Sequence, residues 1–458
     1  MNMDIAGRKV VVVGFGKTGQ ALAAFLVRRK ARVTVSEIKA EEEFGSKTGK
    51  WREKGVAFET GRHRAQTFLA ADLIIPSPGA AALPELAAAK KAGVEVLSEI
   101  ELAARFLKGR IVGITGTNGK STTATLAHKI LKDAGRKAYL AGNIGTPLIS
   151  FVDKSRNDHV YVTEISSFQL EHTELFRADI AALLNISLNH LDWHDSFEEY
   201  FGAKKRIFLN QSADDLAILN ADDRLVRGLA KKVRPRVRFF SLKTEVDQGA
   251  FLREGWIVLK DEGGEQRFMR TAEIRLPGLH NQENVLAAAL IAKEFGVEPR
   301  SMGASIRSFP GLEHRLEKVL TIGGILFIND SKATTVGATI KALQSLDRRI
   351  VLILGGRDKG ADFRLLRSHV RQSVKTVVLL GEARDKIAAA LRNTVPMVVA
   401  ASLREAVRFA HAAASRGDVV LLAPACTSFD MFKNFEARGK AFKREVEKLA
   451  ESVRRGGD

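Results

Sequence analysis

The sequence predicts an α/β protein made of three domains, each built on a mostly parallel β-sheet. An apolar run of strand length is followed by an amphipathic, helix-like stretch at Lys9–Val13, again at Arg110–Ile114 and again at Ile350–Leu354. This alternation is typical of βαβ units. A chain of 458 residues has room for roughly two to four domains of about 100–200 residues each. We place the three domains at residues 1–98, 99–311 and 312–458.

The first two predicted domains open in the same way, with a strand, a glycine-rich turn and a helix. In the first domain the strand Lys9–Val13 is followed by a helical stretch from 18 to 29, and short apolar runs at Arg32–Val35 and Asp72–Ile75 supply further strands. In the second domain the strand Arg110–Ile114 leads through glycines into the periodic segment Lys120–Ala134. Both openings place a glycine loop at the carboxyl end of a strand.

The third predicted domain is marked off by residues that break regular structure. Ser308-Phe309-Pro310-Gly311 precedes a hairpin-like stretch at Thr321–Ile325, where two glycines separate apolar runs. The apolar runs Ile350–Leu354 and Thr376–Leu380 then predict parallel strands.

Composition and charge exclude several classes of protein and favour certain partners. Lys and Arg number 72 against 53 Asp and Glu, a formal net charge of 72 − 53 = +19, which favours nucleic acid, an anionic membrane or phosphorylated small molecules as partners without choosing among them. The single cysteine, Cys426, excludes an intrachain disulfide and a multi-cysteine zinc site. No apolar run reaches the roughly 20 residues of a membrane span, and the first residues lack a signal-peptide pattern. We therefore expect a cytoplasmic protein without a membrane span.

The first glycine loop has the pattern G-x-G-x-x-G, with Gly14, Gly16 and Gly19 between a strand and a helix. In that position backbone N–H groups can bind a diphosphate. Together with Ser36-Glu37 at the end of the second strand, the loop fits an NAD-type dinucleotide site. A tight turn that lets helix and strand pack closely fits as well, so the residues alone leave both interpretations open.

The second glycine loop indicates a nucleotide triphosphate. Its residues 113–122 read Gly-Ile-Thr-Gly-Thr-Asn-Gly-Lys-Ser-Thr, and in a P-loop the lysine neutralises the β and γ phosphates while the serine hydroxyl coordinates Mg²⁺. The strict P-loop pattern requires glycine at position 114, where this chain has isoleucine. The predicted ATP-binding residues are Gly116, Thr117, Asn118, Gly119, Lys120, Ser121, Thr122 and Thr123.

The segment Thr115–Thr122 resembles the ATP loop of the Mur ligases, which form amide bonds in bacterial cell-wall precursors at the expense of ATP. The resemblance implies a Rossmann-like N-terminal domain that binds UDP, a central P-loop ATPase-like domain and a Rossmann-like C-terminal domain. The first glycine loop would then bind the UDP diphosphate, with Thr18, Ser36 and Asn143 as contacts and without a nicotinamide.

The metal-binding residues also follow from this resemblance. Glu164, in Glu-Ile-Ser-Ser-Phe-Gln, is expected to bind one Mg²⁺ with Ser121, and His190 to bind a second. His190 and His194 also have the spacing of a zinc pair, but no third ligand is evident nearby. Lys204 matches the lysine that is carbamylated in the family, a change that turns a cation into an anion able to approach Mg²⁺. The predicted catalytic residues are thus Lys120, Glu164, His190 and Lys204.

The remaining predicted contacts are assigned by similarity as well. For ATP they are Asn281 and Asn284, which read on their own are helix-capping residues, together with Arg315 and Asp330 in the third domain. For the incoming amino acid they are Thr334, Lys359, Ser428 and Phe435. A lysine with hydroxyl groups suits a dicarboxylate, and these segments resemble the branch of the family that adds D-glutamate.

The resemblance implies an ATP-dependent acid–amino-acid ligase that joins D-glutamate to UDP-N-acetylmuramoyl-L-alanine through an acyl phosphate, with two Mg²⁺ ions. We expect a monomer that binds no nucleic acid. Three alternatives remain at this stage: a Mur-type ligase for another amino acid, a nucleic-acid-stimulated P-loop ATPase that would account for the positive charge, and an NAD oxidoreductase.

Overall fold

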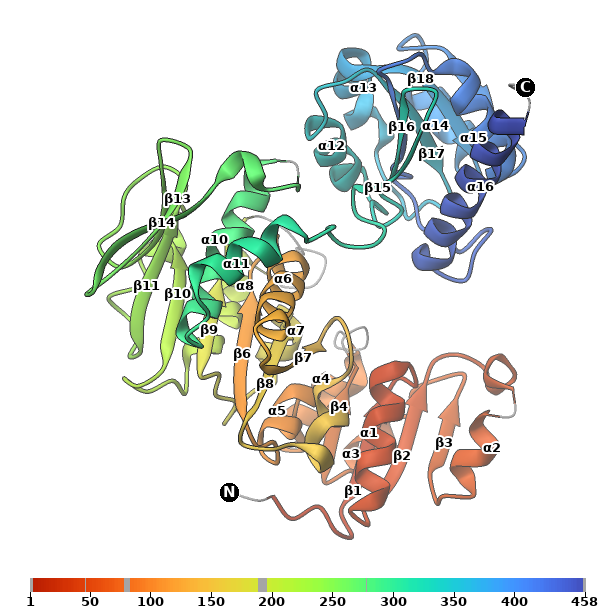
Figure 1. Cartoon of the computed structure of the whole chain (residues 1–458). Helices are drawn as coiled ribbons and strands as arrows, with labels where there is room; N and C mark the ends of the chain where they lie inside the picture. The colour runs from red at the N-terminus through yellow and green to blue at the C-terminus, as the bar shows by residue number, and fades with distance from the viewer. Residues whose placement is uncertain (1–2, 46, 78–82, 188–195, 277, 456–458) are drawn as a thin grey trace. The chain divides into compact units, whose positions relative to one another are not determined.

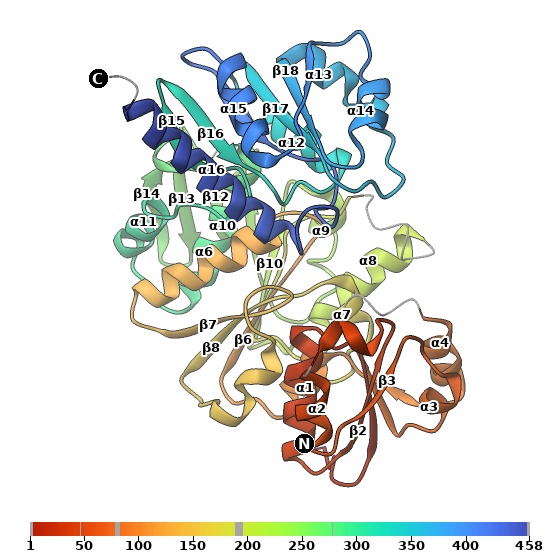
Figure 2. The same cartoon turned by 90° about the vertical axis from the view of Figure 1, so that its right-hand side faces the viewer.

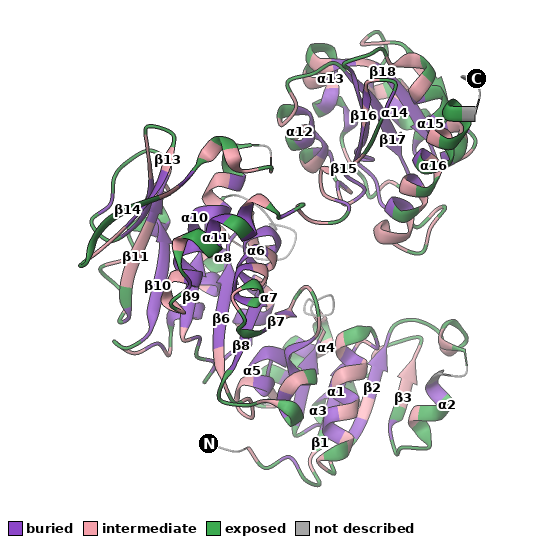
Figure 3. Ribbon diagram, in the orientation of Figure 1, coloured by how far each residue is buried: buried purple, intermediate pink, exposed green. Residues whose placement is uncertain are grey.

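A computed structural model of the whole chain describes residues 3–45, 47–77, 83–187, 196–276 and 278–455. The chain forms two compact units. Unit 1 comprises Met1–Arg275 and Leu279–Phe309, and unit 2 comprises Leu276–Gly278 and Pro310–Asp458. Unit 1 contains two β-sheets and unit 2 contains one, and in each sheet most strands are buried (Figures 1 and 3).

The first sheet of unit 1 has five parallel strands in the order β3-β2-β1-β4-β5, which matches the first five strands of the Rossmann order 3-2-1-4-5-6. Its strands are β1 (Lys9–Val13), β2 (Arg32–Glu37), β3 (Ala57–Thr60), β4 (Leu73–Pro76) and β5 (Glu95–Val96). Its helices are α1 (Lys17–Arg28), η1 (Glu41–Phe44), α2 (Lys47–Arg52), α3 (Ala65–Leu69), α4 (Pro84–Lys91) and α5 (Glu99–Ala104).

Strand β1 shows why the first apolar run is unbroken. Val10 and Val12 pack into one core with α1, whereas Val11 and Val13 pack into another core with residues of α3 and α4. Because both faces of a parallel sheet are covered, every position of a central strand is apolar rather than every second one. The run of valines is therefore the sequence of a strand covered on both faces.

The second sheet of unit 1 has nine strands in the order β14-β13-β12-β11-β10-β9-β6-β8-β7. Strands β6 to β12 pair in parallel, and β13 and β14 are added as antiparallel strands. The bounds are β6 (Arg110–Thr115), β7 (Lys137–Gly142), β8 (His159–Glu164), β9 (Ile180–Leu183), β10 (Leu216–Asn220), β11 (Arg236–Ser241), β12 (Gly249–Arg253), β13 (Trp256–Asp261) and β14 (Gly264–Arg270).

The helices of this sheet bring the second glycine loop next to a distant part of the chain. Helix α6 begins directly after that loop and packs against α10, which lies more than 140 residues further on (Figure 2). The helices are α6 (Lys120–Asp133), η2 (Leu148–Lys154), α7 (Ser167–Glu171), α8 (Phe197–Lys205), η3 (Arg206–Phe208), α9 (Arg224–Arg227), η4 (Thr271–Glu273), α10 (Leu279–Glu294) and α11 (Pro299–Arg307).

A buried carboxylate ties the two sheets of unit 1 together. Glu101 of α5 accepts hydrogen bonds from the backbone N–H groups of Glu174, Leu175 and Phe176 at 2.7–3.2 Å and forms an ion pair with Arg105 at 2.7 Å. One hydrophobic core also runs continuously through residues of both sheets. These contacts explain why the two sheets belong to one compact unit.

Unit 2 has a six-stranded sheet in the order β15-β16-β20-β17-β18-β19, parallel except for the β15–β16 hairpin. Strand β17 places Ile350, Leu352 and Leu354 in one core and Val351 and Ile353 in the other, so both of its faces are covered too. The strands are β15 (Glu317–Ile322), β16 (Ile325–Asn329), β17 (Ile350–Gly355), β18 (Val374–Leu380), β19 (Met397–Val399) and β20 (Val419–Leu422). The helices are α12 (Val336–Gln344), η5 (Phe363–Leu366), α13 (Arg367–Ser373), α14 (Arg384–Ala390), α15 (Leu403–Ala413) and α16 (Phe435–Arg455).

The predicted fold class is confirmed: the chain has three α/β sheets, and the predicted strands and hairpin are present. The domain bounds 1–98, 99–311 and 312–458 stay a prediction. Across the described residues, no helix combines the length and the apolar character needed to cross a membrane.

Candidate active site

The second glycine loop connects the carboxyl end of β6 to the first turn of α6. Gly119 precedes the helix with a left-handed φ of 85°, and a Cβ added there would lie 2.2 Å from Asn284 Oδ1. Lys120 donates hydrogen bonds to the carbonyl oxygens of Gly116 at 2.9 Å and Thr117 at 3.0 Å. The first-turn N–H groups of α6 have no carbonyl partner within the helix, which favours an anion at this end.

Groups from two other parts of the chain, Asn185 and Tyr200, hold this loop. Asn185, two residues after β9, accepts hydrogen bonds from Thr117 N at 2.9 Å through its carbonyl and from Asn118 N at 2.8 Å through its side chain. The Thr117 hydroxyl lies 3.0 Å from the Tyr200 hydroxyl of α8. Sequence analysis missed Asn185 and the role of Tyr200, because neither residue belongs to the glycine-rich pattern.

The two asparagines predicted for ATP lie beside the same loop. Asn284 is buried on α10, where its Oδ1 accepts a hydrogen bond from Thr123 Oγ1 at 3.1 Å and its Nδ2 donates to Asn281 Oδ1 at 3.1 Å. Asn284 therefore lies against Gly119 and binds Thr123 in the first turn of α6, so it supports the glycine loop.

Glu164 stands at the end of β8, next to the glycine loop, because β8 pairs with β6 in parallel with Ile114 opposite Glu164. Its side chain is only 2% exposed. One carboxylate oxygen accepts a hydrogen bond from Asn143 Nδ2 at 2.8 Å, and the other, Oε2, has no hydrogen-bond partner among the described residues. A buried carboxylate oxygen left unpaired is costly unless something binds it.

The turn that follows Glu164 has a structural basis. Ser166 caps helix α7 by accepting a hydrogen bond from Gln169 N, and the Gln169 side chain in turn accepts one from Ser166 N at 3.0 Å. Ile165 is fully buried in the core. The segment thus turns sharply after β8 and leaves Glu164 at the strand end.

Lys204 of α8 is 2% exposed, and its ammonium group lies 3.4 Å from Thr115 Oγ1 and 4.8 Å from the centre of the Tyr200 ring. Burial lowers the pKa of Lys204 well below that of an ordinary lysine, and the positive charge of Lys120 lowers it further, whereas the charge of Glu164 opposes the shift. The structure therefore brings Lys120, Glu164 and Lys204 together and favours a neutral amine at Lys204.

Two further observations concern metal binding. Ser121 is buried in the first turn of α6, where a P-loop serine coordinates Mg²⁺. The unpaired Glu164 oxygen and the Ser121 hydroxyl are hard oxygen donors, which fit Mg²⁺. The predicted ligand His190, like His194, lies outside the described residues.

The first glycine loop leads into α1, and here Gly19 is required by close packing: an added Cβ would lie 2.0 Å from Gly14 O. Glu37 at the end of β2 is engaged by backbone groups, since it accepts hydrogen bonds from Phe15 N at 2.8 Å and Lys39 N at 3.1 Å. An NAD ribose would have to compete with these bonds. The structure thus accounts for the loop as a tight helix–strand turn.

The three predicted UDP contacts have different surroundings. Thr18 lies half-buried in the first turn of α1, next to Lys17, whose ammonium group donates to the carbonyl of Gly145. Ser36 is fully buried, with its hydroxyl 2.7 Å from His63 Nδ1. Asn143 is exposed and bonded to Glu164, as described above.

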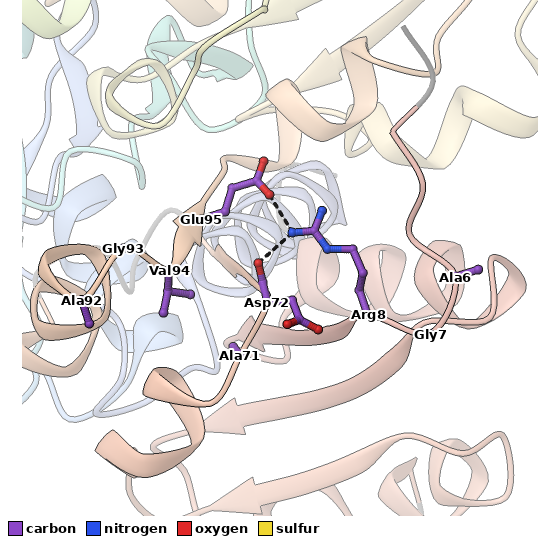
Figure 4. A pocket seen from close by; sticks show the side chains of 9 residues that line it. All are labelled: Ala6, Gly7, Arg8, Ala71, Asp72, Ala92, Gly93, Val94 and Glu95. Carbon is purple, nitrogen blue, oxygen red and sulfur yellow. Dashed lines mark hydrogen bonds and ion pairs between the residues drawn. The ribbon is translucent and has the colours of Figure 1, made fainter.

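A hollow of about 820 Å³ lies at the opposite end of the first sheet (Figure 4). Arg8, just before β1, forms an ion pair with Glu95 at 2.7 Å and donates to the Asp72 carbonyl at 2.8 Å, so its charge is engaged by protein groups. Ligands of such parallel sheets bind at the carboxyl ends of the strands, whereas this hollow is at the amino ends. This hollow is therefore separate from the candidate site.

In unit 2, the predicted nucleotide contacts Arg315 and Asp330 lie near each other, since the charge of Arg315 acts on Asp330. Asp330 follows β16, is buried, and accepts a hydrogen bond from Leu316 N at 3.2 Å. Burial raises the pKa of Asp330 to about 6, against the opposing effects of the Leu316 hydrogen bond and of the charges on Arg315 and Lys332.

Three of the four residues predicted for the amino acid lie on loops at the carboxyl ends of strands in unit 2. Thr334 follows β16, Lys359 follows β17, and Ser428 follows β20. Lys359 is exposed and Ser428 is buried. Phe435 begins α16, and its carbonyl accepts a hydrogen bond from Ser331 Oγ at 2.9 Å. The carboxyl edge of this sheet is where a ligand of a parallel α/β domain binds.

Comparison with protein families identifies the class to which this fold and site belong. The family model for the MurD-like N-terminal domain of Mur ligases matches residues 8–98, the Mur ligase middle domain matches 114–292, and the glutamate ligase domain of Mur ligases matches 314–426. The chain belongs to the Mur ligase family, which confirms the resemblance inferred from its sequence.

Individual relatives narrow the comparison to one kind of ligase. The chain is 46% identical to the UDP-N-acetylmuramoylalanine--D-glutamate ligase of Koribacter versatilis over 99% of this chain and 100% of that protein. It is 48% identical to the protein of the same name from Acidobacterium capsulatum over 96% of both chains. Among solved structures, the UDP-N-acetylmuramate-alanine ligase MurC of Thermotoga maritima superposes with a TM-score of 0.61 at 19% identity, covering 96% of this chain and all of that one, which supports the fold.

Proposed function

We propose that this chain is an ATP-dependent ligase that joins D-glutamate to UDP-N-acetylmuramoyl-L-alanine in the synthesis of peptidoglycan precursors. The observation that carries the proposal is the similarity, over nearly the full length of both chains, to relatives named UDP-N-acetylmuramoylalanine--D-glutamate ligase. The geometry around the second glycine loop supports it, because Lys120, Glu164 and Lys204 lie together beside a loop suited to phosphate.

The proposed chemistry has two steps. A carboxylate oxygen of the L-alanine residue attacks the γ-phosphorus of ATP, which releases ADP and leaves an acyl phosphate. The neutral amine of D-glutamate then attacks the acyl carbon, phosphate leaves with the C–O bond electrons, and the amine loses its proton to solvent. Because phosphoryl transfer depends mostly on positioning and charge stabilisation, the protein must hold the phosphates in line and shield their charge.

Residues of unit 1 would act on the phosphates. Lys120 would release its loop carbonyls and neutralise the β and γ phosphates, while residues 116–123 supply backbone N–H groups. We propose that Ser121 and Glu164 hold one Mg²⁺ and that His190 and a carbamate on Lys204 hold a second. Bound Mg²⁺ would lower the cost of negative charge in the transition state.

Carbamylation of Lys204 is supported by its surroundings, since only a neutral amine reacts with CO₂ and burial favours that form. A ¹³C-NMR experiment with ¹³C-bicarbonate tests it. We expect a carbamate signal in the unsubstituted chain and none in a Lys204→Arg variant, with Lys205→Arg, on the exposed side of the same helix, as a control that keeps the signal. A signal that survives in Lys204→Arg would contradict the assignment.

We further propose that Asn281, Asn284, Arg315 and Asp330 contribute to the ATP site, that Thr18, Ser36 and Asn143 contribute to the UDP-sugar site, and that Thr334, Lys359, Ser428 and Phe435 bind D-glutamate. Lys359 would pair with a carboxylate of the amino acid. The enzyme is proposed to work in the cytoplasm as a monomer, and light scattering of the purified chain would check the oligomeric state.

The deciding experiment measures phosphate release from ATP with Mg²⁺ and UDP-N-acetylmuramoyl-L-alanine, with D-glutamate, L-glutamate, L-alanine, L-lysine and diaminopimelate offered in parallel. We expect phosphate release and an amide product with D-glutamate alone. Turnover with another amino acid would keep the family and reject the proposed pocket. ATP hydrolysis that needs nucleic acid rather than the UDP-sugar would reject the function.

A further inference from the structure

Arg438 is a buried arginine near the start of α16 whose hydrogen bonds go to one hydroxyl and three carbonyl oxygens. Its side chain is 2% exposed. Nε donates to Ser331 Oγ at 3.0 Å, and Nη2 donates to Ser331 O at 2.9 Å and to Cys426 O at 3.1 Å. Nη1 donates to Thr427 O at 3.2 Å. One guanidinium group thus binds two loops that are almost 100 residues apart in the sequence.

The first of these loops follows β16 and carries Thr334. Ser331, which Arg438 binds through both its hydroxyl and its carbonyl, lies three residues before Thr334. The Ser331 hydroxyl also donates to the carbonyl of Phe435 at 2.9 Å. Arg438 therefore fixes the position of this loop relative to the first residue of its own helix.

The second loop follows β20 and carries Ser428, directly after the Cys426 and Thr427 carbonyls that Arg438 binds. Thr427 also connects the second loop to a third loop, the one that follows β17 and carries Lys359. Its backbone exchanges two hydrogen bonds of 3.0 Å with that of Arg357, which lies two residues before Lys359.

Burying the charged guanidinium group of Arg438 costs free energy, which its hydrogen bonds must offset. Burial lowers the pKa of Arg438 to about 10, so the group is still charged at neutral pH. A buried charge is unfavourable unless hydrogen bonds compensate for it. Arginine is the side chain with five donors in a rigid plane, whereas lysine has three donors on one atom. Holding four oxygens on two loops requires the arginine geometry.

We infer that Arg438 is a positioning residue that holds the loops of Thr334, Ser428 and Lys359 together at the D-glutamate site. The inference rests on the proposed function, because it assigns these loops to D-glutamate. Arg438 does not itself have to touch the amino acid. Its loss would let the loops move apart, and small displacements of binding groups weaken binding strongly.

Steady-state kinetics of the full-length enzyme separate positioning from a purely structural role. The variants are Arg438→Lys, which keeps the charge, and Ser331→Ala, which removes one acceptor and leaves the arginine in place. Arg444→Gln, an exposed arginine on the same helix, is the matched control. The KM values for D-glutamate and for UDP-N-acetylmuramoyl-L-alanine are measured separately, with thermal unfolding of each variant.

We expect Arg438→Lys to raise the KM for D-glutamate at least about tenfold, the equivalent of one lost charge-assisted hydrogen bond, and Ser331→Ala to raise it in the same direction. The KM for the UDP-sugar should stay within about twofold in both variants, and Arg444→Gln should match the unsubstituted chain. If Arg438→Lys does not fold, the KM of Ser331→Ala for D-glutamate alone tests the inference.

Two results would overturn the inference, and they differ from failure of the proposed function. Equal changes in both KM values would show a general structural role, and an unchanged KM for D-glutamate in a folded variant would show no role in positioning. If the unsubstituted chain does not turn over D-glutamate at all, the proposed function fails, and this inference fails with it.

Discussion

Alanine in place of Gly119 tests the second glycine loop most directly, because two effects of the structure meet at that position. The residue has a φ of 85°, which an L-amino acid adopts only with strain, and an added Cβ would lie 2.2 Å from Asn284 Oδ1. Asn284 would have to move away and lose the 3.1 Å hydrogen bond that it accepts from Thr123.

The expected loss of stability follows from these two effects. The left-handed conformation costs an alanine about 1–2 kcal/mol, and the lost hydrogen bond costs about 1 kcal/mol. The free energy of unfolding should therefore fall by about 2–3 kcal/mol. Gly135 at the other end of α6 is the matched control, since its φ is 75° but an added Cβ there meets no atom within 4 Å. Gly135→Ala should show the conformational cost alone.

Urea unfolding and the KM for ATP are the two measurements. Gly119→Ala should raise the KM for ATP at least about tenfold, because a shift of the loop weakens several phosphate contacts together, whereas Gly135→Ala should leave that KM unchanged. If the two variants have the same stability and the same KM for ATP, the argument from loop geometry is refuted.

Three further substitutions test other parts of the molecule. Glu164→Gln should lower the rate at saturating Mg²⁺ at least about 100-fold, since even residues behind a metal ligand contribute 10–100-fold; a Mg²⁺ titration of activity measures it. Asp330→Asn should raise the free energy of unfolding at pH 7.5 by up to about 3 kcal/mol, as measured by urea unfolding. A carboxyl with a folded-state pKa near 6 makes stability fall as pH rises from about 4 to 6, and the variant should lose this dependence. Gly439→Ala should lower stability by about 1–3 kcal/mol, because its Cβ would lie 2.2 Å from His314 Nδ1.

Each of these expectations has a clear contrary result. For Glu164 it is an unchanged rate at saturating Mg²⁺. For Asp330 it is an asparagine variant that is less stable than the unsubstituted chain at pH 7.5, and for Gly439 it is an alanine variant that unfolds at the same urea concentration as the unsubstituted chain.

Burial explains part of the difference between the strands that the sequence patterns predict and those that they miss. The runs at β1, β6, β17 and β18 are mostly apolar, and their predicted bounds lie within two residues of the observed ones. Strand β3, Ala57–Thr60, is only partly buried, and β5 has two residues, so neither has a distinctive apolar pattern. Burial on both faces makes a strand easier to recognise in the sequence, but it is not sufficient, because β9, β10 and β20 are buried at every residue and the sequence analysis does not predict them.

The candidate site shows the same division. The glycine loop, Lys120 and Glu164 follow strands in the sequence, so local pattern and resemblance were enough to propose them. Resemblance also pointed to Lys204 rather than to its neighbour Lys205, and the structure shows a physical difference between them, because it buries the first and exposes the second.

By itself the sequence determined the α/β class, the positions of the two glycine loops and the family, because these depend on residue types at fixed spacing along the chain. Only the tertiary structure decided which side chains share a site: Asn284 beside the glycine loop, Glu164 with an unpaired oxygen, Lys204 buried with a lowered pKa and Arg438 across two loops. Contacts between residues far apart in sequence, and the burial that shifts a pKa, arise only when the chain is folded.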